Sequence, residues 1–117
     1  MNNALAGGQR SLDDGDLARA RESYQSALES VSLTHEAALK VGEGLYRTHD
    51  FAGAVRAFQR AGTFARSEAQ AQYYNAVSLF EIGRYREAKR ELAAALPSIE
   101  VTPEVARYRA KIQGSLN

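Results

Sequence analysis

The chain of 117 residues contains no cysteine, only two prolines and no long run of apolar residues. Without cysteine it can form no disulfide, no thiolate zinc site and no thiol nucleophile. Without a run of about 20 apolar residues it has no predicted transmembrane helix. The first nine residues lack the basic region and the apolar stretch of a signal peptide. We therefore expect a cytoplasmic protein without membrane insertion, or else a domain excised from a longer chain.

An excess of charge of either sign is also missing, because the formal net charge is +1. This balance excludes strong electrostatic steering by the molecule as a whole. Residues 1–58 carry six basic and eight acidic side chains, whereas residues 59–117 carry nine and six. The basic side chains of the second half are interspersed with glutamates, which is typical of a solvated helix face rather than of a dense phosphate-binding patch. We expect no nucleic-acid partner.

Motifs that carry catalysis or metal binding are absent as well. The sequence has neither the Gly-rich phosphate loop of nucleotide-binding proteins nor a nucleophile elbow. Its two histidines, His35 and His49, have no second ligand at metal spacing, and we assign them to a helix start and a turn. The acidic run Asp13-Asp14-Gly15-Asp16 lacks the alternating ligands and the distal glutamate of a calcium loop. We expect no catalytic residue, no metal site and no cofactor, and therefore no enzyme.

What the chain does have is a pattern that returns every 34 residues. A fixed period of this length is the signature of a repeat array. Helix-forming residues dominate throughout, so we predict an all-α protein. The aligned columns are Gly8, Gly42 and Ala76; Leu17, Phe51 and Tyr85; Ala20, Ala54 and Ala88; Tyr24, Phe58 and Leu92; and Ala27, Ala61 and Ala95.

Each period is predicted to form two helices joined by a tight turn. Apolar residues recur at three- and four-residue spacing in two stretches of each copy. Gly15 and Gly83 suit the left-handed backbone that ends the first helix, and His49 stands at that place in the middle copy. Asp16 and Asp50 are placed to cap the second helices. Small residues in the columns allow the paired helices to approach closely, with bulky residues beside them.

A solitary helix is predicted after the third copy. Pro97 stops the preceding helix, and Thr102 followed by Pro103 is a start signal, with a capping hydroxyl and a proline in the first turn. Val105 and Ile112 lie on one apolar face of this segment. We expect the helix to cover the last repeat, which has no further neighbour.

In these columns the sequence resembles the tetratricopeptide-repeat (TPR) family, whose 34-residue motif places small and aromatic residues at fixed positions. The resemblance covers about residues 3–100. It implies a single TPR domain, 1–117, with repeats at about 1–34, 35–68 and 69–100 and a capping helix at about 103–115. The implied fold is an all-α, right-handed superhelix (a solenoid) of three helix-turn-helix units plus the capping helix, seven helices in all. First helices would line its concave face.

The copies depart from the family motif at several positions. None has the large aromatic residue at the fourth position, where Ala4, Ala38 and Gln72 stand, and the closing proline is also missing. Asn75 stands where an apolar residue is expected. Its side chain is either a satisfied buried polar group or a sign that this first helix is slightly rotated.

The resemblance also implies a peptide-binding groove lined by first-helix positions outside the core columns. The aromatic and apolar side chains among them exceed what a solvent-facing helix needs, which favours a contact surface. We expect Tyr73 and Val77 to be exposed there, whereas Tyr46 and Phe80 either line the groove or pack beside the core. The groove positions are Asn2, Leu5, Gln9, Leu12 and Asp13 in the first copy; Glu36, Leu39, Lys40, Glu43, Tyr46 and Arg47 in the second; and Gln70, Tyr73, Tyr74, Val77, Phe80 and Glu81 in the third.

Proteins similar to this one bind peptides or other proteins in the groove and have no catalysis of their own. The expected function is therefore a non-catalytic scaffold that captures a segment of another protein. Among the positions where some relatives clamp the C-terminal carboxylates of chaperones, only Lys40 is basic, so we do not expect such tails as ligands. The alternative is self-assembly into a homo-oligomer through the repeat edges, which the glycine-weakened first helix around Gly7 and Gly8 would favour.

Overall fold

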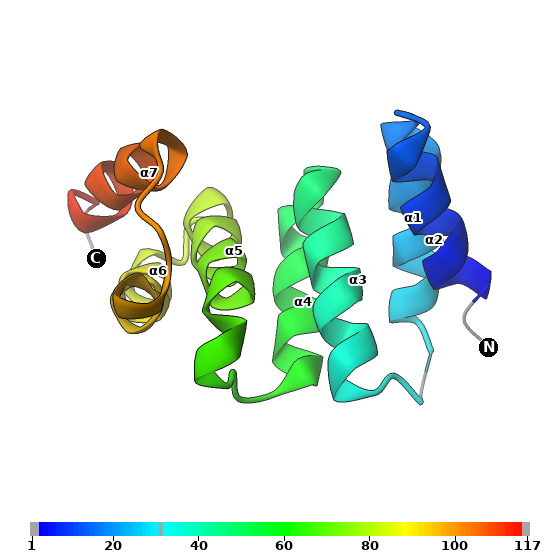
Figure 1. The fold of residues 1–117 in the computed structure, drawn as a ribbon, viewed down its shortest axis with the longest axis horizontal. Coiled ribbons are helices and arrows are strands. Elements are labelled where there is room, and N and C mark those ends of the chain that lie inside the picture. The colour runs from blue at the N-terminus through cyan, green and yellow to red at the C-terminus, as the bar shows by residue number, and fades with distance from the viewer. Residues whose placement is uncertain (1–2, 31, 116–117) are drawn as a thin grey trace. The chain divides into compact units, whose positions relative to one another are not determined.

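The computed structural model describes residues 3–30 and 32–115 (Figure 1). These ranges contain seven α-helices: α1 (Asn3–Asp13), α2 (Leu17–Leu28), α3 (His35–Arg47), α4 (Phe51–Ala61), α5 (Ala69–Glu81), α6 (Tyr85–Ala95) and α7 (Pro103–Gln113). Two 3₁₀ turns, η1 (Arg66–Glu68) and η2 (Leu96–Ser98), flank α5 and α6. The described residues include no strand, and none of their helices has the length and apolar character needed to cross a bilayer. The prediction of an all-α protein with seven helices is confirmed.

The helix starts preserve the 34-residue period of the sequence. Helices α2, α4 and α6 begin at residues 17, 51 and 85, and helices α3, α5 and α7 begin at residues 35, 69 and 103. The final helix therefore begins where the first helix of a fourth pair would begin.

The turn inside each pair has the same backbone conformation in all three copies. Gly15 (φ 80°), His49 (φ 67°) and Gly83 (φ 85°) all lie in the left-handed region, which glycine adopts freely and histidine tolerates better than most residues. Asp16 and Asp50 then cap α2 and α4. Each carboxylate accepts a hydrogen bond from the backbone N–H three residues on, at 3.1 and 3.0 Å. The predicted turns and caps are confirmed.

The chain divides into two compact units, Met1–Gly62 and Thr63–Asn117. The first unit contains α1 to α4, which are two copies of the repeat, and the second contains α5 to α7. The division falls in the connection between α4 and α5. The sequence predicts that residues 1–117 form a single TPR domain. This depends on how the two units combine, so it stays a prediction.

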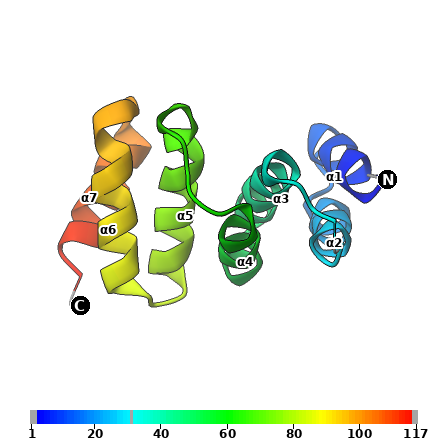
Figure 2. The same ribbon diagram turned by 90° about the horizontal axis from the view of Figure 1, so that it is seen from below.

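Two helix pairs form the first unit, α1 with α2 and α3 with α4, and α2 also contacts α3 (Figure 2). Inside each pair a glycine lies under an aromatic ring. A Cβ atom on Gly8 would lie 2.9 Å from the Tyr24 ring, and one on Gly42 would lie 2.6 Å from the Phe58 ring. Real Cβ atoms do not approach rings so closely. Each aromatic ring therefore packs directly against the helix backbone at a glycine, where no side chain is in the way.

Two arginines join the first pair to the second. The Arg21 guanidinium of α2 donates from Nε and Nη2 to the Thr48 carbonyl at the end of α3, at 3.0 and 2.6 Å. The Arg60 guanidinium of α4 donates to the carbonyls of Leu28 and Ser30, at the end of α2 and just beyond it. Carbonyls at helix ends lack intrahelical donors and carry partial negative charge. The two arginines therefore tie together α2, α3 and α4.

In the second unit α7 packs against the pair formed by α5 and α6. The Tyr73 hydroxyl of α5 donates to Glu104 Oε2 of α7 at 3.2 Å. The Tyr108 hydroxyl of α7 donates to Glu81 Oε2 of α5 at 3.0 Å. The expected contact of the final helix with the third pair is confirmed.

Removing the Arg60 guanidinium should destabilise the first unit. In Arg60→Gln the carbonyls of Leu28 and Ser30 lose a charged donor, and we expect the free energy of unfolding to fall by about 1 kcal/mol in urea titrations. Arg56→Gln is the matched control on the same helix, because Arg56 reaches only Glu29 at 4.0 Å with both side chains largely exposed. We expect it to change the free energy by less than about 0.5 kcal/mol. Equal losses in the two variants would contradict the role assigned to Arg60.

Candidate functional site

Two of the expected groove positions on α5 are buried. Tyr73 is 1% exposed and Val77 is 0% exposed, so the expectation that both are exposed is wrong. The hydrogen bond to Glu104 holds Tyr73 against α7, and Val77 lies one turn further along the same helix face. Tyr73 is covered because the final helix packs on α5.

The aromatic positions near the helix ends take part in packing. Tyr46 is half-buried, and its ring meets the Phe51 ring of α4 edge to face with centroids 6.2 Å apart. Phe80 is also half-buried, and its ring meets the Tyr108 ring edge to face at 6.4 Å. Packing beside the core is therefore the alternative that the contacts of Tyr46 and Phe80 favour. Tyr74 is half-buried as well.

The remaining expected positions have mixed environments. Leu5 is 8% exposed, so its assignment to the groove is wrong, because this side chain belongs to the core of the first unit. Asn2 lies outside the described residues. Leu39 is half-buried, and Glu36 and Gln70 are exposed. The other positions on α1 and α3 meet at one pocket.

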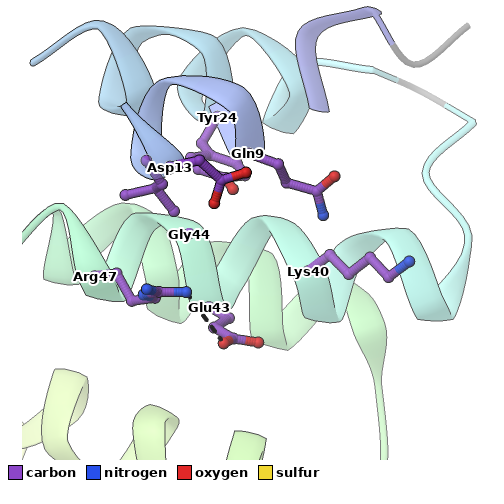
Figure 3. Close-up of a pocket in the computed structure, with 8 residues that line it drawn as sticks. Gln9, Asp13, Tyr24, Lys40, Glu43, Gly44 and Arg47 are labelled. Atoms are coloured by element: carbon purple, nitrogen blue, oxygen red, sulfur yellow. Dashed lines mark ion pairs between the residues drawn. The ribbon is translucent and has the colours of Figure 1, made fainter. Parts of the chain in front are cut away.

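A pocket of about 340 Å³ lies in the first unit between α1 and α3 (Figure 3). Six of its eight lining residues occupy groove positions expected from the sequence. The other two, Tyr24 and Gly44, are not among the positions expected from the sequence, because Tyr24 stands in a core column and Gly44 in no recognised column. The lining consists of Gln9, Leu12 and Asp13 from α1, Tyr24 from α2, and Lys40, Glu43, Gly44 and Arg47 from α3.

Tyr24 forms the floor of this pocket and is held there by two glycines. Its side chain is 2% exposed. A Cβ atom on Gly44 would overlap the ring at Cζ, and one on Gly8 would lie 2.9 Å from Cε2. The ring is therefore held between the backbones of α1 and α3. A glycine inside a helix costs about 1 kcal/mol relative to alanine, so Gly44 is the signal in the sequence that could have revealed this close approach.

The hydroxyl is the polar end of the pocket floor. Within residues 3–30 and 32–115 the Tyr24 hydroxyl is not among the buried side-chain atoms that lack a hydrogen-bond partner, and Tyr24 lines the pocket. Burial raises the pKa of Tyr24, the Arg47 charge lowers it, and the charges of Glu43 and Asp13 raise it further. The net effect is a raised pKa. A tyrosine hydroxyl is in any case protonated near neutral pH, because its ordinary pKa is about 10, and it can donate a hydrogen bond.

Charge is unevenly distributed around the pocket. Lys40, Glu43 and Arg47 share one face of α3 because they lie three and four residues apart. Arg47 Nη1 and Glu43 Oε2 are 3.9 Å apart with both side chains about half exposed, so this ion pair stabilises only weakly. Figure 3 shows Gln9 on the Lys40 side and Asp13 on the Arg47 side. One end of the pocket is therefore basic, and the other has one more acidic than basic group.

A second cavity, of about 510 Å³, lies in the second unit at the start of α5 and the end of α6. Its wall includes Gln72, whose Nε2 donates to Glu91 Oε1 at 3.2 Å. Asn75 Nδ2 reaches the same oxygen at 3.5 Å, and its buried Oδ1 has no partner among the described residues. Asn75 is thus a buried polar group that is satisfied only on its amide nitrogen. No expected groove position lines this cavity.

Comparisons of the chain with protein-family models, with curated proteins and with solved structures give no match. The function has to be inferred from the repeat pattern and from the pocket between α1 and α3.

Alanine substitutions of two helix glycines should have opposite effects on stability. In Gly44→Ala the new methyl group would overlap the Tyr24 ring, and we expect the free energy of unfolding to fall by about 1–3 kcal/mol. In Gly7→Ala the methyl group would meet the Ser23 side chain, at 3.5 Å from Oγ and 4.0 Å from Cβ, which are ordinary contacts. Better helix propensity should then raise the free energy by up to about 1 kcal/mol. Urea unfolding measures both, and a Gly44→Ala protein as stable as the parent would show that Tyr24 is not confined.

Proposed function

We propose that the chain is a TPR array, a right-handed superhelix of three helix pairs with a covering helix, and that it is a non-catalytic protein-interaction module. Its ligand is a peptide or protein segment bound between α1 and α3. The 34-residue register of the helix starts and the repeated turn conformation support the array. In such an array α1 and α3 are the first helices of neighbouring pairs, which is where a concave groove would lie.

The observation that carries the proposal is that six expected groove positions meet at one pocket. They come from two helices separated by the whole of α2, so closeness in sequence does not bring them together. Gln9, Lys40 and Arg47 offer hydrogen-bond donors, and Asp13 and Glu43 offer acceptors. A few polar groups around a buried aromatic residue are suited to the main chain and side chains of a peptide.

The size of the pocket sets the size of the ligand. A volume of about 340 Å³ is at the small end for ligand pockets. It accommodates a few peptide residues rather than a folded domain. We therefore expect a short segment to carry the contact.

Selection from a random peptide library displayed on phage tests the proposal. We expect the chain to enrich peptides whose synthetic copies bind in fluorescence anisotropy. The double variant Lys40→Glu/Arg47→Glu should weaken their binding by at least about tenfold, since it reverses two charges at the pocket. Both side chains are exposed, so the fold should be retained.

The matched control is Arg86→Glu/Arg90→Glu, which makes the same change in charge at exposed positions of α6. It should leave the affinity unchanged. If the library yields no binding peptide, or if both double variants weaken binding equally, the proposal is wrong.

A further inference from the structure

We infer that the Tyr24 hydroxyl is a ligand-binding group, and that the pocket selects an extended peptide with one acidic and one basic side chain about three residues apart. This inference rests on the proposed function. It adds a recognition residue to it and names the class of segment that would be bound.

The hydroxyl is not required by the packing of the repeat. Phe58 and Leu92 stand in the same column as Tyr24, and each is 1% exposed. A ring or an aliphatic side chain without a polar atom therefore fills this position in the other two copies. The hydroxyl is an addition of the first copy, and Tyr24 lines the pocket, so an acceptor on a bound ligand can reach it.

Gly44 is a second departure from the repeat, and it meets the first at the same point. The corresponding residues are Arg10 in the first copy and Ser78 in the third. Only a residue without a Cβ atom lets Tyr24 Cζ, the atom that carries the hydroxyl, lie against the backbone of α3. Gly44 itself lines the pocket. The glycine thus brings the polar end of the ring to the pocket.

In the second unit the corresponding residues of α5 and α7 contact one another. Its helices α5, α6 and α7 stand two periods after α1, α2 and α3. The Tyr108 ring meets Phe80, and the Tyr108 hydroxyl donates to Glu81 at 3.0 Å, so these residues bridge α5 and α7. The counterparts of Phe80, Glu81 and Tyr108 in the first unit are Leu12, Asp13 and Lys40, which line an open pocket.

The residues at the floor differ in a complementary way. The counterparts of Tyr24 and Gly44 are Leu92 and Ile112, which are 1% and 0% exposed. In the second unit α7 therefore has an isoleucine where α3 has a glycine, and neither Leu92 nor Ile112 has a polar atom in its side chain. The first unit instead combines a ring that carries a hydroxyl with a glycine. This combination of a hydroxyl and a glycine at the pocket is therefore a specific property of the first unit and not of the repeat as such.

The chemistry at the floor indicates an acceptor on the ligand. A tyrosine hydroxyl is protonated near neutral pH, because its ordinary pKa is about 10, and burial raises the pKa of Tyr24 further. A main-chain carbonyl is the acceptor that every peptide residue carries. Recognition through such a carbonyl does not depend on the side chain at that residue, so selectivity has to come from the charged ends of the pocket.

The two ends call for opposite charges on the ligand. Lys40 attracts an acidic side chain, and Asp13 with Glu43 attracts a basic one beside Arg47. Lys40 and Arg47 are seven positions apart on α3, which is about 10 Å along a helix. An extended chain covers that distance in about three residues. Because these side chains are partly or fully exposed, the charges add selectivity more than affinity.

A defined peptide set tests the inference. The probes are blocked eight-residue peptides of Ala, Ser and Gly that carry one Glu and one Lys three positions apart, in either order. Control peptides carry the same two residues at adjacent positions. Titration into the ¹⁵N-labelled full chain should shift the amide signals of α1 and α3 for one order of the spaced pair. Its Kd should be about three- to tenfold lower than that of the adjacent pair.

Two variants identify the groups involved. Tyr24→Phe should raise the Kd about three- to tenfold, which corresponds to one hydrogen bond, and leave the urea midpoint unchanged because Phe58 fills the same column. Lys40→Glu should weaken the Glu/Lys peptide and bind a peptide with Lys in place of that Glu more tightly than the parent does. Lys40 is exposed, so this charge reversal tests the inference even if Tyr24→Phe folds poorly.

The outcomes separate this inference from the proposed function. Library-selected peptides that lose binding in Lys40→Glu/Arg47→Glu, yet bind Tyr24→Phe as tightly as the parent and share no charge spacing, would overturn the inference alone. If neither the library nor the defined set gives a ligand for the pocket, both the inference and the proposed function are wrong. Loss of binding in Tyr24→Phe together with the reversed preference of Lys40→Glu supports both.

Discussion

The first unit depends on the close approach of helix backbones to aromatic rings at positions that have no side chain. Gly8 and Gly44 hold the Tyr24 ring from two sides, and Gly42 lies against Phe58. Each glycine costs about 1 kcal/mol of helix propensity, whereas burying an aromatic side chain contributes about 1.5–3 kcal/mol. Replacing a side chain by glycine is favourable here only if the ring fills the space that the missing Cβ atom leaves, because atoms next to unfilled space lose dispersion contacts.

The same constraint provides the candidate site with a rigid base. Tyr24 belongs to the core through its ring and to the pocket through its hydroxyl, so the group that would meet a ligand cannot move without disturbing the packing. Arg21 and Arg60 hold the carbonyl ends of α3 and α2, which fixes the helices that carry the floor and one wall. A site whose parts are already in place loses less conformational entropy when a ligand binds.

In the second unit the helices keep the same 34-residue register, but different side chains pack between them. Ala76 and Leu92 stand in the glycine and aromatic columns, and α7 contributes the rings and carboxylates that meet α5. Because α7 begins in the register of a first helix, it lies beside α5 at the place where a groove would open. Tyr73 is buried for this reason, and the accessible polar side chains of α1 and α3 are left as the surface that could bind a ligand.

The sequence by itself determined the helices, their turns and their caps. Gly15, His49, Gly83, Asp16 and Asp50 act on residues within one turn of themselves, so local chemistry is enough to predict them. It also indicated Gln9, Lys40 and Arg47 as accessible positions, since helical spacing fixes which residues share a face. Only the tertiary structure decided that Tyr73 is covered while Lys40 is open, and that Tyr24 reaches the pocket past Gly44. The burial of each of these side chains depends on which distant helix packs against it. The 34-residue pattern does not say which helix this is or how large its side chains are at the contact.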